Sequence, residues 1–96
     1  MLLWSFEVDA AHAADFERVY GAAGDWARLF ARSPDYLGTE LLKDTLRPGR
    51  YLTVDRWSSA TAFASFKEQW RAEYDALDAR CESLTKAETP LGAFEA

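Results

Sequence analysis

Three side chains of this sequence have the chemistry of a catalytic group. His12 is the only histidine, and an ordinary pKa of about 6.5 leaves it mostly neutral and able to accept a proton at neutral pH. Arg56 and Trp57 are adjacent in the sequence. A guanidinium can stabilise a phenolate, and an indole N–H can donate a hydrogen bond. We therefore predict a catalytic role for His12, Arg56 and Trp57.

Each of these residues also has a structural interpretation. His12 fits an exposed residue near the start of a helix, without a function. Trp57 fits a packed ring whose N–H is bonded to a backbone carbonyl. Arg56 fits a surface ion pair, and its acidic neighbours on the expected sheet are Glu7, Glu40 and Asp55.

A second group of aromatic side chains is predicted to bind substrate. Gly21 and Gly24 interrupt a helical pattern just before Trp26, and such a break admits the edge of a ligand, so Trp26 is a candidate lid. The alternative is that Trp26 anchors the second helical segment in the core. The other candidates lie on apolar helix stripes, where core packing is the alternative interpretation: Tyr20, Phe66, Trp70 and Tyr74.

Alternation of side chains predicts the elements that position these residues. A first strand spans residues 2–8, and a helix in two pieces follows from about Ala13, with Asp25 capping the second piece and Ser33-Pro34 ending it. A second strand spans residues 36–44, with Leu37, Thr39 and Leu41 on one face and Tyr36, Gly38, Glu40 and Leu42 on the other.

A hairpin and a second helix complete the pattern. Pro48-Gly49 turns the chain into a strand that ends at Trp57. Ser58 or Ser59 then caps a long helix over residues 59–84, bent near its middle. A short last strand covers residues 89–95. Pro90 is tolerated only at the beginning of this strand or if the strand lies at a sheet edge.

The order strand, helix, hairpin, helix, strand predicts an α+β ferredoxin-like sandwich in one domain, residues 1–96, with both helices on one face of a four-stranded antiparallel sheet. The other face is expected to be too apolar to remain in water. It would carry either Trp4, Phe6 and Val8 or Tyr36, Leu42, Tyr51 and Trp57. A homodimer that packs sheet against sheet would cover it.

Composition narrows the class of partner. The net charge is −5 and there is no basic run, so nucleic acid is not expected. The sequence has no apolar block long enough for a membrane segment, and we expect a cytoplasmic protein. With one histidine and one cysteine, a multi-histidine or cysteine-rich metal site and an internal disulfide are excluded within one chain. Cys81 is expected to be a small buried hydrophobe. Aromatic residues make up 15% of the chain, which favours a cavity or an interface.

Over nearly its whole length the chain resembles the antibiotic biosynthesis monooxygenase family, small ferredoxin-like proteins that pair into a dimeric α/β barrel. The most family-like feature is Trp57 at the end of a strand, followed at once by a serine-capped helix. The segments that carry the resemblance are residues 20–30, residues 35–44, residues 51–57 leading to Phe63 and Phe66, and residues 91–95.

The resemblance implies a monooxygenase without a cofactor that oxidises an aromatic or phenolic small molecule with O2. Haem-degrading members use an Asn and a helix His; this chain has no Asn, and offers Phe66, Lys67, Trp70 and Tyr74 on that helix. Haem degradation is therefore disfavoured. The quinone-forming members also use an Asn, so another polar group must replace it. The alternatives are a non-catalytic module that binds a hydrophobic metabolite in an aromatic cavity, and an isomerase or cyclase.

Overall fold

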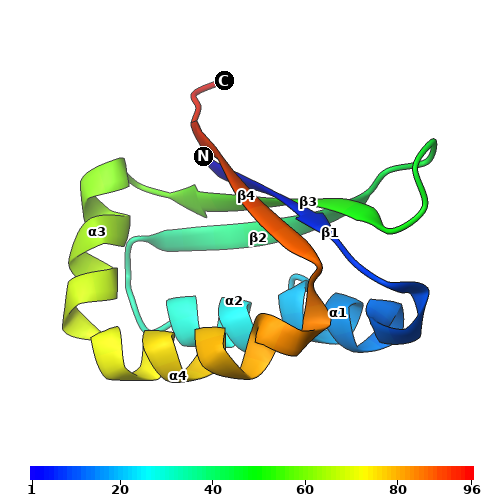
Figure 1. Cartoon of the computed structure of the whole chain (residues 1–96). Coiled ribbons are helices and arrows are strands. Elements are labelled where there is room, and N and C mark those ends of the chain that lie inside the picture. Colours follow the sequence, from blue (N-terminus) through cyan, green and yellow to red (C-terminus); the bar gives the residue numbers. More distant parts are fainter.

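One antiparallel sheet and a layer of helices make up the protein (Figure 1), in a computed structural model that describes residues 1–96. The strands lie in the order β2-β3-β1-β4, which confirms the predicted α+β ferredoxin-like fold. Figure 1 shows α1, α2 and α4 beneath the sheet and α3 at one end of it. The elements are β1 (Leu2–Glu7), α1 (Ala13–Tyr20), α2 (Asp25–Phe30), β2 (Tyr36–Lys43), β3 (Arg50–Trp57), α3 (Ala60–Gln69), α4 (Arg71–Cys81) and β4 (Ala87–Ala93), with short 3₁₀ turns at Ala10–His12 and Glu82–Leu84.

The first helix is in two pieces, as predicted, but its second cap is different. Gly24, not Asp25, is the N-cap of α2, and Asp25 lies in the first turn, where it pairs with Arg28 at 2.9 Å. Gly24 packs against α1 so closely that a Cβ there would lie 2.3 Å from the carbonyl oxygen of Val19. Only glycine fits this junction, which therefore fixes where α2 begins under the sheet.

The long second helix is also divided. Ser59 caps α3 by accepting a hydrogen bond from the Ala62 N–H at 3.1 Å, as expected. The helix stops at Trp70, whose backbone leaves the helical region, and α4 starts at the next residue. The apolar stripe continues across this break, since Phe66, Leu77 and Cys81 are all buried. The prediction of a small buried Cys81 is confirmed.

The register of β2 differs from simple alternation. A bulge shifts the pairing between Tyr36 and Gly38, so that Tyr36 pairs with Trp57 whereas Thr39 pairs with Asp55. Gly38 has φ +131°, a conformation that other residues rarely adopt. The extra residue places Tyr36 and Thr39 on the same face, where their hydroxyl groups form a hydrogen bond of 2.5 Å. The predicted separation of these two side chains was therefore wrong.

The composition of the two sheet faces also corrects the prediction. Most members of the two apolar sets, which were expected on opposite faces, share the helix-covered face: Phe6, Val8, Tyr51 and Trp57 belong to the buried core, and Trp4 and Tyr36 pack against it. Around them lies Phe16, which is fully buried. Of the two sets, Leu42 is the exception. The uncovered face carries smaller aliphatic side chains: Leu3, Leu42, Leu52 and Val54.

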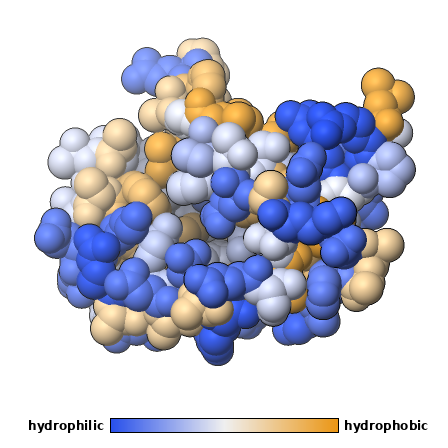
Figure 2. All heavy atoms as spheres, viewed as in Figure 1, coloured by the Kyte–Doolittle hydropathy of each residue, from blue (hydrophilic) through white to orange (hydrophobic).

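The surface of the helix layer is largely hydrophilic, whereas apolar surface gathers near the chain ends and at the tip of the β2–β3 hairpin (Figure 2). None of the helices, the longest of which has 11 residues, has the length and apolar character that a membrane crossing requires. The cytoplasmic location stays a prediction. β4 is an edge strand, as the presence of Pro90 within it requires.

Candidate functional site

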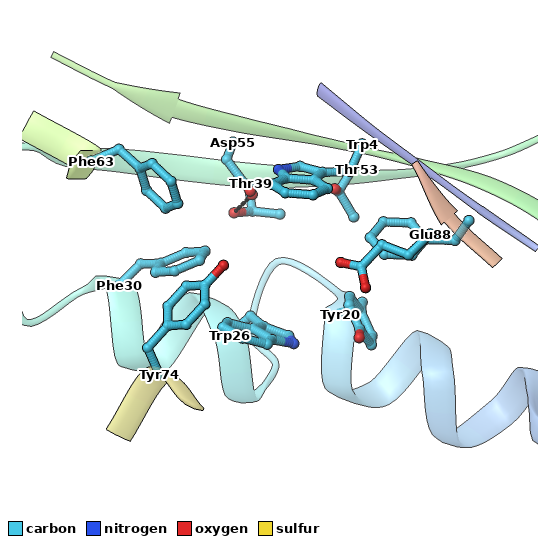
Figure 3. A pocket seen from close by; sticks show the side chains of 11 residues that line it. Trp4, Tyr20, Trp26, Phe30, Thr39, Thr53, Asp55, Phe63, Tyr74 and Glu88 are labelled. Carbon is cyan, nitrogen blue, oxygen red and sulfur yellow. Dashed lines mark hydrogen bonds between the residues drawn. The ribbon is translucent and has the colours of Figure 1, made fainter. Parts of the chain in front are cut away.

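A cavity of about 40 Å³ lies between the sheet and the helix layer, and every strand and α-helix contributes a side chain to it (Figure 3). Its apolar walls are aromatic: Trp4, Phe6, Tyr20, Trp26, Phe30, Phe63 and Tyr74. Its polar lining consists of Thr39, Thr53, Asp55 and Glu88. The combination of aromatic walls with a few polar groups is typical of sites that bind small molecules.

Asp55 is the buried charged residue of this cavity. The residue is 7% exposed and belongs to the central strand β3. The Thr39 hydroxyl donates to its Oδ1 at 2.7 Å, and Thr39 is in turn bonded to the Tyr36 hydroxyl. Burial raises the pKa of Asp55 above its ordinary value, and the hydrogen bond from Thr39 opposes part of that shift. Asp55 is therefore a stronger base than an exposed aspartate.

The rings of two tyrosines, Tyr20 and Tyr74, line the cavity. Figure 3 shows the Tyr74 hydroxyl directed into the cavity, on the side of Thr39 and Asp55. Burial, together with nearby carboxylates, raises the pKa of Tyr74 to about 12. Burial likewise raises the pKa of Tyr20. Both phenols therefore stay protonated at neutral pH and can donate hydrogen bonds.

Two indole N–H groups are buried without a hydrogen-bond partner, those of Trp26 and Trp57. An unpaired buried donor costs about 1 to 3 kcal/mol, so such groups are rare and call for an explanation. Trp26 lines the cavity. Trp57 packs among aromatic rings, with centroids 5.4 Å from Phe30 and 5.5 Å from Phe63. The backbone carbonyl considered as a partner for the Trp57 N–H is absent.

Glu88 gives the cavity a second carboxylate. It comes from the edge strand β4, and Figure 3 shows its carboxylate near Tyr20. Glu88 belongs to an exposed strand, and partial desolvation of its carboxylate, helped by the negative charge of Asp78, raises its pKa. No lysine or arginine lines the cavity, so the charge of its lining is only negative when Asp55 and Glu88 are ionised.

The five predicted substrate-binding residues do not all meet at this cavity. Tyr20, Trp26 and Tyr74 line it. Phe66 is buried behind it, against Trp57 and Phe30. Trp70 lies at the break between α3 and α4, and the Arg32 guanidinium carbon is 4.9 Å from the centroid of the Trp70 ring.

The three predicted catalytic residues lie in three separate places, outside the cavity lining. His12 precedes the first turn of α1. Arg56 lies on the uncovered face of the sheet, where it forms an ion pair with Glu40. Trp57 lines a different cleft, beside Ser58 and the two chain ends. The structure does not bring these residues together in one chain, and their catalytic roles stay predictions.

Asp55, Thr53, Thr39 and Glu88 were not predicted as site residues. A signal for two of them was present in β3, where Thr53 and Asp55 alternate in phase with Tyr51 and Trp57. A charged residue on the aromatic face of a central strand is expected to be buried, and buried charges concentrate at functional sites. Thr39 could not be recognised in the same way, because the bulge in β2 is needed to place it beside Asp55.

Solved structures with the same fold include three that cover nearly the whole chain. A candidate antibiotic biosynthesis monooxygenase from Deinococcus radiodurans is 21% identical with a TM-score of 0.68, covering 100% of this chain and 95% of its own. A mutant of SnoaB, a cofactor-independent oxygenase from Streptomyces nogalater, is 24% identical with a TM-score of 0.66, covering 99% and 92%. PA3566 from Pseudomonas aeruginosa is 15% identical with a TM-score of 0.65, covering 98% and 92%.

These similarities establish the fold, and the sequence itself gives the family. A search of curated proteins finds no significant match. The model of the antibiotic biosynthesis monooxygenase family, however, matches residues 1–77, a span that contains all of the cavity lining except Glu88. A match over most of the sheet and helix layer, in a chain with this fold, means that the protein belongs to the antibiotic biosynthesis monooxygenase family.

Proposed function

We propose that this protein is a cofactor-independent monooxygenase that oxidises an aromatic or phenolic small molecule with O2. Its family supports this activity, and the similar SnoaB is described as a cofactor-independent oxygenase. The observation that carries the proposal is the cavity itself. Within aromatic walls it holds a buried carboxylate, Asp55, and the Tyr74 hydroxyl, which Figure 3 shows directed into the same space.

Oxygenation without a cofactor requires a substrate that can give electrons to O2. Removing a proton from an anthrone-type methylene or a phenol makes such an electron-rich anion, and a dry site with fixed donors stabilises it. For a methylene between two aromatic rings, the balanced reaction is CH2 + O2 → C=O + H2O. One oxygen atom enters the substrate, and the other leaves as water with the two methylene hydrogens.

The cavity provides polar groups for these steps although the chain has no Asn. The Tyr74 hydroxyl is suited to donate to an oxyanion, because it is directed into the cavity (Figure 3). The Trp26 N–H is fully buried in the closed site, on the side of Tyr20, and becomes a second donor only if Trp26 moves. Thr39, Thr53 and Asp55 supply the polar wall on the sheet side. These groups are our candidates for the function that an Asn performs in the quinone-forming members.

The site must open to admit an aromatic ring. At about 40 Å³ the cavity has room for a few water molecules, whereas sites for drug-sized ligands are roughly 300 to 1,000 Å³. Two breaks in the helix layer offer the movement. Trp26 lies on the six-residue α2 just after Gly24, and Tyr74 follows the break at Trp70. We propose that Trp26 is the lid of the pocket.

A homodimer through the uncovered sheet face is part of this proposal. That face carries an aliphatic centre, in which Leu52 in β3 and Leu3 in β1 are partly exposed, whereas Val54 between them is already buried in the single chain. Leu42 and Leu37, at the β2 edge, are 44% and 64% exposed. Apolar surface of this kind is typical of subunit interfaces. Packing two sheets together would cover these side chains in a two-fold dimer.

Oxygen uptake tests the proposed activity directly. Purified protein is given anthrone-type and quinol substrates, with product followed by absorbance and with a metal chelator present in a parallel sample. Chelator-insensitive uptake supports the proposal, and loss of uptake in His12→Ala would assign His12 to catalysis. Quenching of tryptophan fluorescence by the same compounds, without any oxygen uptake, would instead favour the binding module.

A further inference from the structure

The carboxylate of Asp55 is held by one oxygen and open at the other. Oδ1 accepts the hydrogen bond from Thr39. No protein group donates to Oδ2. The fully buried side-chain atoms that lack a partner are the indole nitrogens of Trp26 and Trp57, and Oδ2 is not among them, so Oδ2 is not fully buried. Oδ2 is therefore in contact with the cavity, which Asp55 lines. It is free to accept a proton from a molecule bound there.

The hydrogen bonds behind Asp55 have a defined direction when the carboxylate is ionised. Thr39 has a single hydroxyl hydrogen, which it donates to Asp55. The 2.5 Å contact between Thr39 and Tyr36 must then have the Tyr36 hydroxyl as donor. Each donor in this chain points towards the carboxylate. Tyr36 and Thr39 thus orient Asp55 and leave Oδ2 towards the substrate.

We propose that Asp55 is the general base of this enzyme, and that its substrate is a neutral aromatic molecule with an acidic C–H or O–H group. This inference rests on the proposed function and adds the residue and the substrate class to it. In the step, the substrate's C–H or O–H bond breaks, its electron pair stays on the substrate, and the proton forms an O–H bond with Oδ2 of Asp55. No other reactant is needed for this transfer.

The charges of the cavity determine the substrate class. Asp55 and Glu88 are the two charged residues that line it, and both are acidic. A substrate that carries a carboxylate would meet these charges, of which Asp55 is buried and therefore weakly screened, with no cation in the lining to offset them. With a neutral substrate, proton transfer moves one negative charge from Asp55 to the substrate and leaves the total charge unchanged. The cavity thus favours a molecule that becomes an anion only after binding.

Exchange of deuterium measures this proton transfer separately from oxygen chemistry. Anthrone carrying deuterium on its methylene carbon is incubated with the protein in ordinary water without oxygen, and loss of deuterium is followed by mass spectrometry against a protein-free sample. We expect the protein to accelerate the loss. Asp55→Asn should reduce the accelerated rate by about 100-fold or more, the usual contribution of a general base. Glu7→Gln, at an exposed carboxylate outside the cavity lining, is the control.

Thr39→Val tests the positioning role with a readout that simple structural damage would not produce. The Thr39 hydrogen bond lowers the pKa of Asp55, so its removal should move the acidic limb of the pH–rate profile to higher pH. The other titratable groups around the cavity are the phenols of Tyr20, Tyr36 and Tyr74, whose pKa values are raised, and the Glu88 carboxyl. The acidic limb should persist in Glu88→Gln.

The outcomes separate this inference from the proposed function. Exchange that depends on Asp55, without oxygen uptake in air, supports the base and overturns the oxygenase. Oxygen uptake with exchange unchanged in Asp55→Asn overturns the base and leaves the oxygenase standing. No accelerated exchange in the wild-type protein also overturns the base. Thermal unfolding of each variant confirms that it is folded before its rates are compared.

Discussion

Neighbouring residues of β3 place opposite charges on opposite faces of the sheet, and the two environments differ. Arg56 lies on the uncovered face, 42% exposed in its side chain, and is paired with Glu40. Asp55 lies on the covered face and has only a neutral hydroxyl as its partner. The surface charge is satisfied and solvated, whereas the buried charge lacks a cation. A buried charge without a cation costs stability, and groups of this kind are concentrated at functional sites.

The largest expected effect concerns the uncovered face. Leu52→Glu should convert the proposed dimer to a monomer, because the two-fold axis introduces two charges into one apolar interface. Burial of each leucine is worth about 1.5 to 3 kcal/mol, so the dissociation constant should rise by a factor of roughly 100 or more. Analytical ultracentrifugation measures it. A wild-type protein that is monomeric at high concentration would disprove the dimer.

On the covered face, Trp26→Phe removes the unpaired N–H and keeps an aromatic ring. If the N–H donates to the oxyanion formed during oxidation, kcat for anthrone should fall by about 10- to 100-fold, with a smaller change in KM. Stopped-flow absorbance gives both constants. A variant that changes only KM would reduce Trp26 to a binding wall or lid.

Asp55→Asn should stabilise the folded protein at neutral pH. The pKa of Asp55 is raised in the folded state, so burying the ionised carboxylate penalises folding at any pH above that folded-state pKa. The penalty fades as the pH falls through the folded-state pKa and is absent below the ordinary value of 3.8. The difference in unfolding free energy between variant and wild type should therefore shrink in acid. Urea titrations at several pH values measure it; a variant less stable than wild type at pH 7 would contradict the cost assigned to Asp55.

The smallest effect is expected for the ion pair on the other face. Glu40→Gln removes the carboxylate that pairs with Arg56, in a side chain 53% exposed. Exposed ion pairs contribute about 0 to 1 kcal/mol, and this variant should change the unfolding free energy by no more than that. The same urea titrations provide the comparison with Asp55→Asn. A larger loss would show that the charges of the two faces are not as different as their surroundings suggest.

Much of the fold could be predicted from local patterns. The alternation around Tyr51 and Trp57 gave β3, Ser59 gave the start of α3, and the two glycines before Trp26 gave a divided first helix. These features depend on short segments, where side-chain period and capping chemistry are sufficient. Their order along the chain then limits the topology to few arrangements.

The site was less accessible from the sequence, because it depends on contacts between distant segments. The residue type of His12 indicates proton transfer, but its position near a helix start does not say whether the side chain reaches the cavity. Asp55 could not be recognised with certainty, because alternation says which residues share a face but not which face the helices cover. Thr39 required the bulge, which depends on the backbone at Gly38 and not on a side-chain pattern.

That bulge makes the candidate site sensitive to chain length at one position. With its φ of +131°, Gly38 accommodates the extra residue that turns the Tyr36 ring from the uncovered face to the covered one. Deleting this single residue would restore regular pairing in β2 and point the phenol away from Thr39. The strand would survive the deletion, and the hydrogen-bonded chain that ends at Asp55 would lose its first member. In relatives of this protein, a gap at this position would therefore mark a different site within the same fold.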